Sequence, residues 1–209
     1  MRLELVSVAL GPAATPTLPP VSGVLTDEGP AVVAVGGERG PLFASLIAGG
    51  RLAPERGSVL LDGSDDAAVL RRAVALVDTP MVAEPAAALP VATVVREELV
   101  FAERHGGRAD AERVLAELGL RRWLHRPIAD LPAADRLRLL LTLAARRPGV
   151  RALVLTSPER HGGPTADWLA LAAEFTAAGT PVLVIAGHAV EAATRFALPV
   201  LTGRPGPTS

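Results

Sequence analysis

The sequence predicts an α/β domain with a mixed β-sheet core and an inserted helical subdomain. Short apolar runs alternate along the chain with helical patterns, as expected of α/β proteins. The runs AVVAV (31–35), ALVL (152–155) and VLVIA (182–186) are continuously apolar, which is typical of strands covered on both faces. With 209 residues, the chain is long enough to bury a substantial core.

The predicted elements follow from these patterns. Strands are predicted at residues 3–10, 31–35, 58–62, 73–77, 151–156, 181–187 and 198–203. Helices are predicted at residues 41–48, 66–72, 93–104, 108–119, 133–147, 165–178 and 189–195. Residues 93–147 are almost wholly helical and form the predicted subdomain between two groups of strands. Prolines and glycines predict a loop at 79–92 and a flexible tail at 204–209, so one domain is expected to span residues 1–203.

Composition excludes several kinds of chemistry. The formal net charge is −1, and no charge imbalance points to nucleic acid or an anionic membrane surface. The sequence holds no cysteine, lysine, asparagine, glutamine or tyrosine, and all 21 basic residues are arginine. Disulfides, thiolate chemistry and any unaided mechanism that needs a lysine amine or a phenol are therefore excluded. No apolar run has the length of a bilayer span, and no signal segment is present, so a soluble cytoplasmic protein is expected.

The stretch VVAVGGERGPLFASLIAGG (32–50) has the layout of a phosphate-binding loop. Gly36, Gly37 and Gly40 allow a tight turn whose N–H groups, with the following helix N-terminus, could face an anion. Pro41 stands where the lysine and hydroxyl of such loops would follow, and Arg39 is the cation at hand. The segment can therefore be a nucleotide site or a purely structural strand–helix turn.

Two later strands end in residues that bear on the same chemistry. The strand at 151–156 ends in Thr156 and Ser157, neither of which can act as a carboxylate base. Glu159 follows a proline and is expected to point elsewhere. His188 follows the strand at 181–187, where it could contact a γ-phosphate or simply cap a helix, and His161 shows no pairing that suggests a metal site.

The helix within LPAADRLRLLLTLAARRPG (131–149) carries Arg136 and Arg138. A basic helix can bind nucleic acid, but these arginines alternate with leucines and the net charge of the chain is near zero. A solvated helix face is therefore the expected role of both side chains.

Five segments occur together in an order that is characteristic of one family. The chain resembles the nucleotide-binding domain of ABC transporters, the ATP-binding cassette, and the resemblance implies a P-loop NTPase-like fold. It covers nearly the whole chain and rests on these segments: LIAGG (46–50), APERGSVLLDG (53–63), TVVREEL (93–99), LPAADRLR (131–138) and LVLTSP (153–158).

The chain departs from the family at the positions that carry chemistry. The family's phosphate-loop lysine falls on Gly40 or is lost in a shortened loop, and its Mg²⁺-binding Ser/Thr falls on Pro41. The Q-loop glutamine falls on Thr79, and the signature Ser-Gly-Gly-Gln becomes residues 132–135. The remaining positions correspond as follows: the metal aspartate falls on Thr156, the catalytic glutamate on Ser157 and the switch histidine on His188.

The resemblance implies which residues remain for each role. No catalytic residue is expected, because the lysine, metal ligands and general base on which phosphoryl transfer depends are all replaced. Mg²⁺ is not expected to bind. Any weak ATP binding is expected at Gly36, Gly37, Arg39, Gly40 and Thr79.

These departures predict a degenerate ABC subunit without ATP hydrolysis of its own. It is expected to pair with an intact cassette or a membrane permease, and therefore to be cytoplasmic or peripheral at the membrane through that permease, with no nucleic-acid partner. The alternative is a genuine ATP-binding subunit with weak or composite-site ATPase activity. A third interpretation is a free-standing regulator that binds another anion at residues 36–40.

Overall fold

The structure is a computed structural model in which residues 1–188 are described. The helix predicted at 189–195, the strand at 198–203 and the tail at 204–209 lie outside the described residues. None of the described helices is long and apolar enough to cross a membrane.

The described elements include every predicted strand and helix up to residue 188 and one further strand. The strands are β1 (Arg2–Leu10), β2 (Leu18–Thr26), β3 (Ala31–Val35), β4 (Arg56–Leu61), β5 (Val74–Val77), β6 (Ala152–Thr156) and β7 (Val182–Gly187). The α-helices are α1 (Gly40–Ala48), α2 (Ala67–Ala73), α3 (Val91–Phe101), α4 (Arg108–Glu117), α5 (Ala133–Ala145) and α6 (Thr165–Ala177). Short 3₁₀ turns occur at η1 (Arg121–Trp123), η2 (Ile128–Asp130) and η3 (Pro158–His161).

The strands form two sheets. β3, β7, β6 and β5 pair in that order in a parallel sheet, with Val32 opposite Val184 and Val77 opposite Leu155. β2, β1 and β4 form an antiparallel sheet. The prediction of an α/β fold with both strand orientations is thus confirmed.

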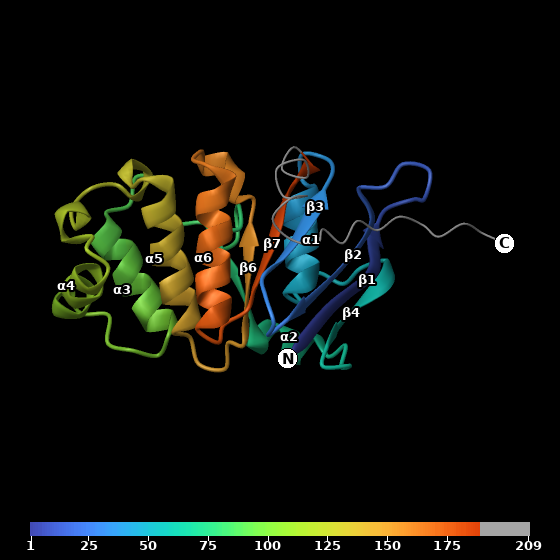
Figure 1. Cartoon of the computed structure of the whole chain (residues 1–209), viewed down its shortest axis with the longest axis horizontal. Helices are drawn as coiled ribbons and strands as arrows, with labels where there is room; N and C mark the ends of the chain where they lie inside the picture. The colour runs from blue at the N-terminus through green and yellow to red at the C-terminus, as the bar shows by residue number, and fades with distance from the viewer. Residues whose placement is uncertain (189–209) are drawn as a thin grey trace.

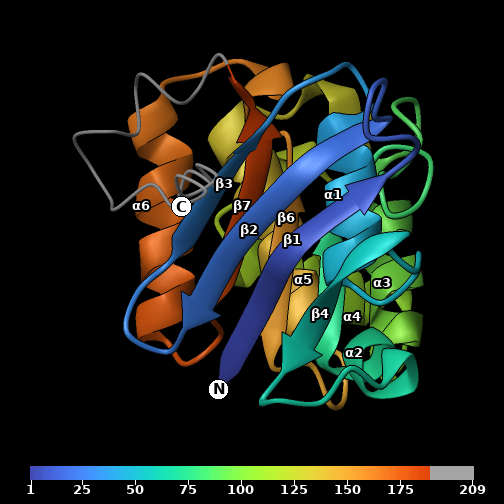
Figure 2. The same ribbon diagram turned by 90° about the vertical axis from the view of Figure 1, so that its right-hand side faces the viewer.

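The elements stack in layers (Figures 1 and 2). Helix α1 lies between the antiparallel and the parallel sheet, and apolar side chains of both sheets pack around it in one cluster. A second cluster joins the other face of the parallel sheet to α3, α4, α5 and α6. The parallel strands are therefore buried on both faces, which explains their continuous apolar runs.

Strand β2 was not predicted. Pro19, Pro20 and Gly23 lie within it and argue against a strand in a sequence-based interpretation. The structure accommodates the prolines because β2 is an edge strand, where an N–H can face solvent. A Cβ on Gly23 would lie 2.5 Å from Cγ2 of Val33, so glycine is required where β2 crosses β3.

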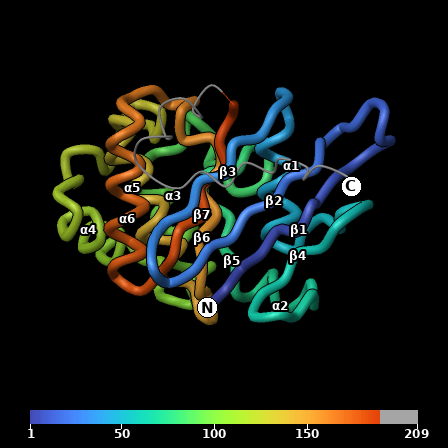
Figure 3. Tube along the Cα trace, turned by 45° about the vertical axis from the view of Figure 1, so that its right-hand side comes forward, coloured from blue at the N-terminus to red at the C-terminus, as the bar shows by residue number. Residues whose placement is uncertain are grey.

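The helical block predicted at 93–147 is present as α3, α4 and α5 with η1 and η2 between them. It begins two residues earlier than predicted, at Val91, directly after Pro90. Parallel pairing brings the ends of β3, β5, β6 and β7 to one edge of the sheet, as the tube in Figure 3 shows. The residues predicted to form a site either follow these strand ends or, in the case of Thr156, form one.

Candidate functional site

The loop after β3 and the residue after β7 meet at this edge. Val35 is paired with Gly187, so Gly36 and His188 follow from adjacent strand ends. A Cβ on Gly36 would lie 2.8 Å from Cδ2 and 2.9 Å from Nε2 of His188. Gly36 thus lets the His188 ring pack against the loop backbone, and the structure brings these two predicted site residues together.

The other residues of the loop are more exposed. Gly37 has a φ of +83°, a conformation that favours glycine, and Arg39 stands exposed at the N-cap of α1 without a side-chain capping bond. Gly40 is the buried first residue of α1, and a Cβ there would lie 2.8 Å from Cγ1 of Val35. Pro41 occupies the first turn, where its missing N–H costs no helical hydrogen bond but removes one donor that could face an anion.

Three hydroxyl groups at the ends of β5 and β6 and in α1 form a hydrogen-bonded chain. Thr79 Oγ1 and Thr156 Oγ1 are 2.7 Å apart, and Thr156 Oγ1 donates to Ser45 Oγ at 2.8 Å. All three residues are fully buried. Thr79 and Thr156 occupy the positions that the family resemblance assigned to the Q-loop glutamine and the metal aspartate, and Ser45 on α1 was missed by the sequence analysis. This series of hydroxyl groups carries no charge and joins α1, β6 and the segment after β5.

Glu159 does not point away from the site, contrary to expectation. Ser157 adopts a φ of +46°, and its N–H donates to the carbonyl of Ile185. This left-handed residue turns the chain so that Oε1 of Glu159 accepts the Gly187 N–H at 2.8 Å. Oε2 of Glu159 is buried and has no hydrogen-bond partner among the described residues. A carboxylate thus lies beside the strand end that leads to His188.

A buried ion cluster lies next to the hydroxyl chain. It comprises one residue after β5, one in the following loop, one in α5 and two in η3: Asp78, Glu84, Arg136, Arg160 and His161. Arg136 donates from Nη2 to Oδ1 of Asp78 at 2.7 Å and from Nε to Oδ2 at 3.1 Å. Arg160 lies 3.2 Å from Asp78 Oδ1 and 2.8 Å from Glu84 Oε1. The cluster therefore connects three segments at the carboxyl edge of the sheet.

Asp78 is only 1% exposed, and its ionisation depends on these partners. Burial alone would raise the pKa of its carboxyl group. The contacts with His161 and Arg136 outweigh burial and lower the pKa of Asp78 to about 2. Asp78 is therefore a permanent internal anion at neutral pH.

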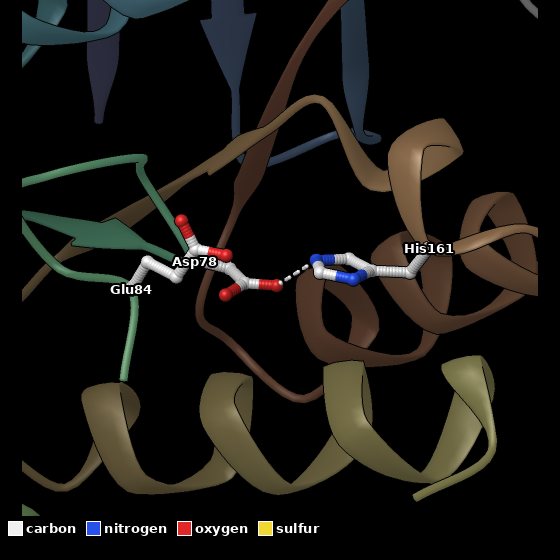
Figure 4. Close-up of side chains that lie close together, drawn as sticks. All are labelled: Asp78, Glu84 and His161. Carbon is white, nitrogen blue, oxygen red and sulfur yellow. Dashed lines mark ion pairs between the residues drawn. The ribbon is translucent and has the colours of Figure 1, made fainter. Parts of the chain in front are cut away.

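Asp78, Glu84 and His161 present ligand atoms within 4.8 Å of one another, close enough to hold a metal ion (Figure 4). His161 Nε2 lies 2.6 Å from Asp78 Oδ2, although its N–H is not aligned as a hydrogen bond. Both oxygens of Asp78 already accept from Arg136. Two guanidinium groups at the same carboxylate repel a cation, so this arrangement fits an ion cluster and not a metal centre.

The cluster corrects two sequence-based expectations. Arg136 was expected on a solvated helix face, yet its side chain is 6% exposed and paired, whereas Arg138 does reach the surface and pairs with Glu174. His161 was expected to show no pairing that suggests a metal site; it does lie beside Asp78 and Glu84, and the two arginines there make the group an ion cluster. The signal that could have found the cluster is the spacing along α5, because Arg136 shares a helical face with the buried Leu139 and Leu140.

Proteins of known structure share the fold described above. No protein-family model and no curated protein sequence matches the chain. An ATP-binding subunit of an ABC transporter is similar in structure, with a TM-score of 0.60 and 21% identity over 94% of this chain and 83% of that one. CbiO1 from Clostridium perfringens, part of the ABC transporter complex CbiONQ, has a TM-score of 0.60 and 16% identity over 89% of this chain and 78% of its own. The layered architecture and these similarities show that this chain has the ABC ATPase fold.

Proposed function

We propose that this chain is a degenerate ABC-type subunit that acts through protein contacts and does not hydrolyse ATP. The observation that carries the proposal is the buried chain of Ser45, Thr156 and Thr79 hydroxyls. It occupies the positions that the family resemblance gives to a metal ligand and the Q-loop glutamine. Neutral hydroxyls that satisfy one another there supply neither a divalent-cation site nor a general base.

The loop at 36–40 offers little positive charge for a triphosphate. Its single cation, Arg39, is preceded by Glu38, and the Glu159 carboxylate lies at the neighbouring strand end. Backbone N–H groups and the α1 dipole remain as attractive elements. ATP is therefore expected to bind weakly and without a requirement for Mg²⁺.

The surface that we propose for a partner is a groove between the loop after β5 and α3, lined by both apolar and charged side chains. The groove encloses about 320 Å³ and is lined by Arg51, Val82, Ala83, Glu84, Pro85, Val94, Glu97, Glu98, Phe101 and Arg147. Val82 is 52% and Phe101 68% exposed, and the adjacent Met81 is 94% exposed. Clustered apolar side chains with a charged rim are typical of protein interfaces. We propose that a membrane permease subunit places a short apolar segment in this groove.

Arg147 shapes one wall of the groove. Its guanidinium lies 5.6 Å from the centre of the Phe101 ring and pairs with Glu98 at 2.6 Å. These contacts hold the Phe101 ring while leaving one face open. An aromatic residue held in this way loses little side-chain entropy when a partner binds, which favours an interface hot spot.

Titration calorimetry of the purified protein with ATP, with and without Mg²⁺, tests the nucleotide part of the proposal. Heats that are absent up to millimolar ATP, or a weak binding curve that Mg²⁺ does not change, agree with it. Micromolar Mg²⁺-dependent binding would contradict it and favour a genuine ATP-binding subunit with a composite site. Crosslinking with an azido-ATP analogue gives an independent readout, because a subunit of the proposed kind should label poorly.

Affinity purification from the protein's own cells tests the partner part. An ABC cassette or a permease identified by mass spectrometry is the expected result. Phe101→Glu should abolish this association and leave the melting temperature unchanged, because the side chain is exposed. Val6→Glu, at an exposed apolar residue of β1 outside the groove, is the matched control. Equal association of both variants with the partner would place the interface elsewhere.

A further inference from the structure

The ion cluster lies where three separate segments converge. Asp78 begins the loop after β5, Arg136 lies in the first turns of α5, and Arg160 and His161 belong to η3 after β6. Asp78 and Arg136 are almost completely buried, at 1% and 6% exposure of their side chains. Their two hydrogen bonds have the bidentate geometry that fixes a carboxylate relative to a guanidinium.

Arg160 extends the connection to the loop itself. Its guanidinium donates to the backbone carbonyl of Asp78 and also contacts the carboxylates of Asp78 and Glu84. The loop between these two acidic residues is therefore held at both ends. Within it, the N–H groups of Val82 and Ala83 donate to the Thr79 carbonyl at 3.1 and 2.9 Å.

The loop exposes apolar side chains, whose contact with water is energetically unfavourable. Met81, at a φ of +62°, is almost fully exposed, and Val82 is half exposed. Neither side chain contributes a buried contact that would fix the loop. The Thr79–Thr156 hydrogen bond fixes the first residue of the loop, and the polar contacts of the cluster restrain the loop at Asp78 and Glu84.

We propose that the ion cluster preorganises the loop 79–84, so that the chain presents Met81 and Val82 to the permease subunit of the proposed function in a fixed conformation without bound nucleotide. Arg136 and Arg160 of the same chain balance the charge of Asp78. The conformational part concerns the chain alone, whereas the use of the loop in docking rests on the proposed function. A preorganised loop lowers the entropy cost of association.

Hydrogen exchange of the isolated full-length protein tests the conformational part. In Arg136→Met, hydrogen exchange of the Val82 and Ala83 amides is expected to accelerate about tenfold or more. The variant loses cluster contacts that oppose local opening of the loop. Amides of β1 and β2 should keep their rates. Arg138→Met is the matched control, because it removes an exposed arginine two positions along the same helix and should change neither region.

Arg160→Met provides a second variant in case loss of Arg136 unfolds the protein. It retains the Asp78–Arg136 pair, removes both contacts to the loop ends and should give the same local acceleration. Unchanged exchange at Val82 and Ala83 in a folded variant would overturn the proposal, as would an equal acceleration in Arg138→Met. Because the measurement uses neither ATP nor a partner, its outcome is separate from that of the calorimetry and affinity purification.

Discussion

Asp78→Asn is expected to remove a specific pH dependence from the stability of the fold. The pKa of Asp78 is lowered from 3.8 to about 2, despite burial, by His161 and Arg136. A depressed carboxyl pKa stabilises the folded state above the unfolded value, and the stabilisation is lost as the pH falls through the folded value. The difference of roughly 1.8 pKa units corresponds to about 2 kcal/mol, of which about 1 kcal/mol is lost by pH 3. Because the side chain is 1% exposed, solvent screening does not reduce this figure greatly.

Urea unfolding at pH 6 and pH 3 measures the effect directly. At pH 6 the variant should be less stable by about 3–5 kcal/mol, because Arg136 and Arg160 then lack their buried counter-charge. Between pH 6 and pH 3 the wild type should lose about 1 kcal/mol more than the variant, since all other carboxylates titrate in both proteins. If Asp78→Asn does not fold, the Asp78→Asn/Arg136→Met double variant takes its place, because it removes both charges of the pair.

Parallel loss of stability in the wild type and the variant would refute this reasoning. It would mean that the pKa of Asp78 is not lowered in the folded protein and that the cluster is not organised around its charge. Addition of salt separates this group from surface carboxylates, whose contributions are screened, whereas a buried pair is screened much less.

Five further substitutions, two matched pairs and one single change, test other parts of the structure by urea unfolding. Thr156→Val keeps the shape of the side chain but leaves both hydroxyl partners without their hydrogen bonds, and it should cost about 1–3 kcal/mol. Thr142→Val, whose hydroxyl only returns to a carbonyl of its own helix, should change stability by less than about 0.5 kcal/mol. Gly57→Ala should cost at least about 2 kcal/mol, because its Cβ would lie 2.3 Å from a backbone oxygen of β1. Gly63→Ala, at a similar positive φ in open space, should cost only about 1–2 kcal/mol. Arg51→Met should cost about 2 kcal/mol, because Arg51 donates to three backbone carbonyls at the ends of α1 and α2. Equal stability within either matched pair would contradict the corresponding argument.

The fold was predictable because periodicity reports burial directly. Strand β3 was predicted at 31–35 and found at those residues, because a continuously apolar run such as AVVAV is typical of a strand that packs between two layers. Strand β2 was missed because its prolines are compatible with a strand only at a sheet edge, which is a tertiary property. The existence of the helical block was predictable, but the exact ends of its helices were not. Pro90 and the residues after it set the start of α3.

The candidate site was predictable only in part. The family resemblance assigned Thr79, Thr156 and His188 to one site, and the structure places the Thr79 hydroxyl against that of Thr156. Ser45 was missed because a serine within an apolar helix gives no sequence signal of its buried partner. Arg136 was assigned to solvent because local alternation with leucine cannot reveal a counter-charge 58 residues away.

The hydroxyl chain and the ion cluster at the carboxyl edge of the sheet stabilise the structure in different ways. The hydroxyl chain replaces charge by neutral hydrogen bonds, so the segment after β5 is joined to α1 and β6 without the desolvation cost of buried ions. The ion cluster keeps its charges and balances Asp78 with arginines from other segments. Bidentate ion pairs of this kind fix the relative orientation of the segments more specifically than hydroxyl groups do. A bound nucleotide with its metal ion would supply both kinds of interaction from outside the chain. On the proposed function, the chain has internalised these interactions, and a partner would therefore meet the same surface whether or not ATP is present.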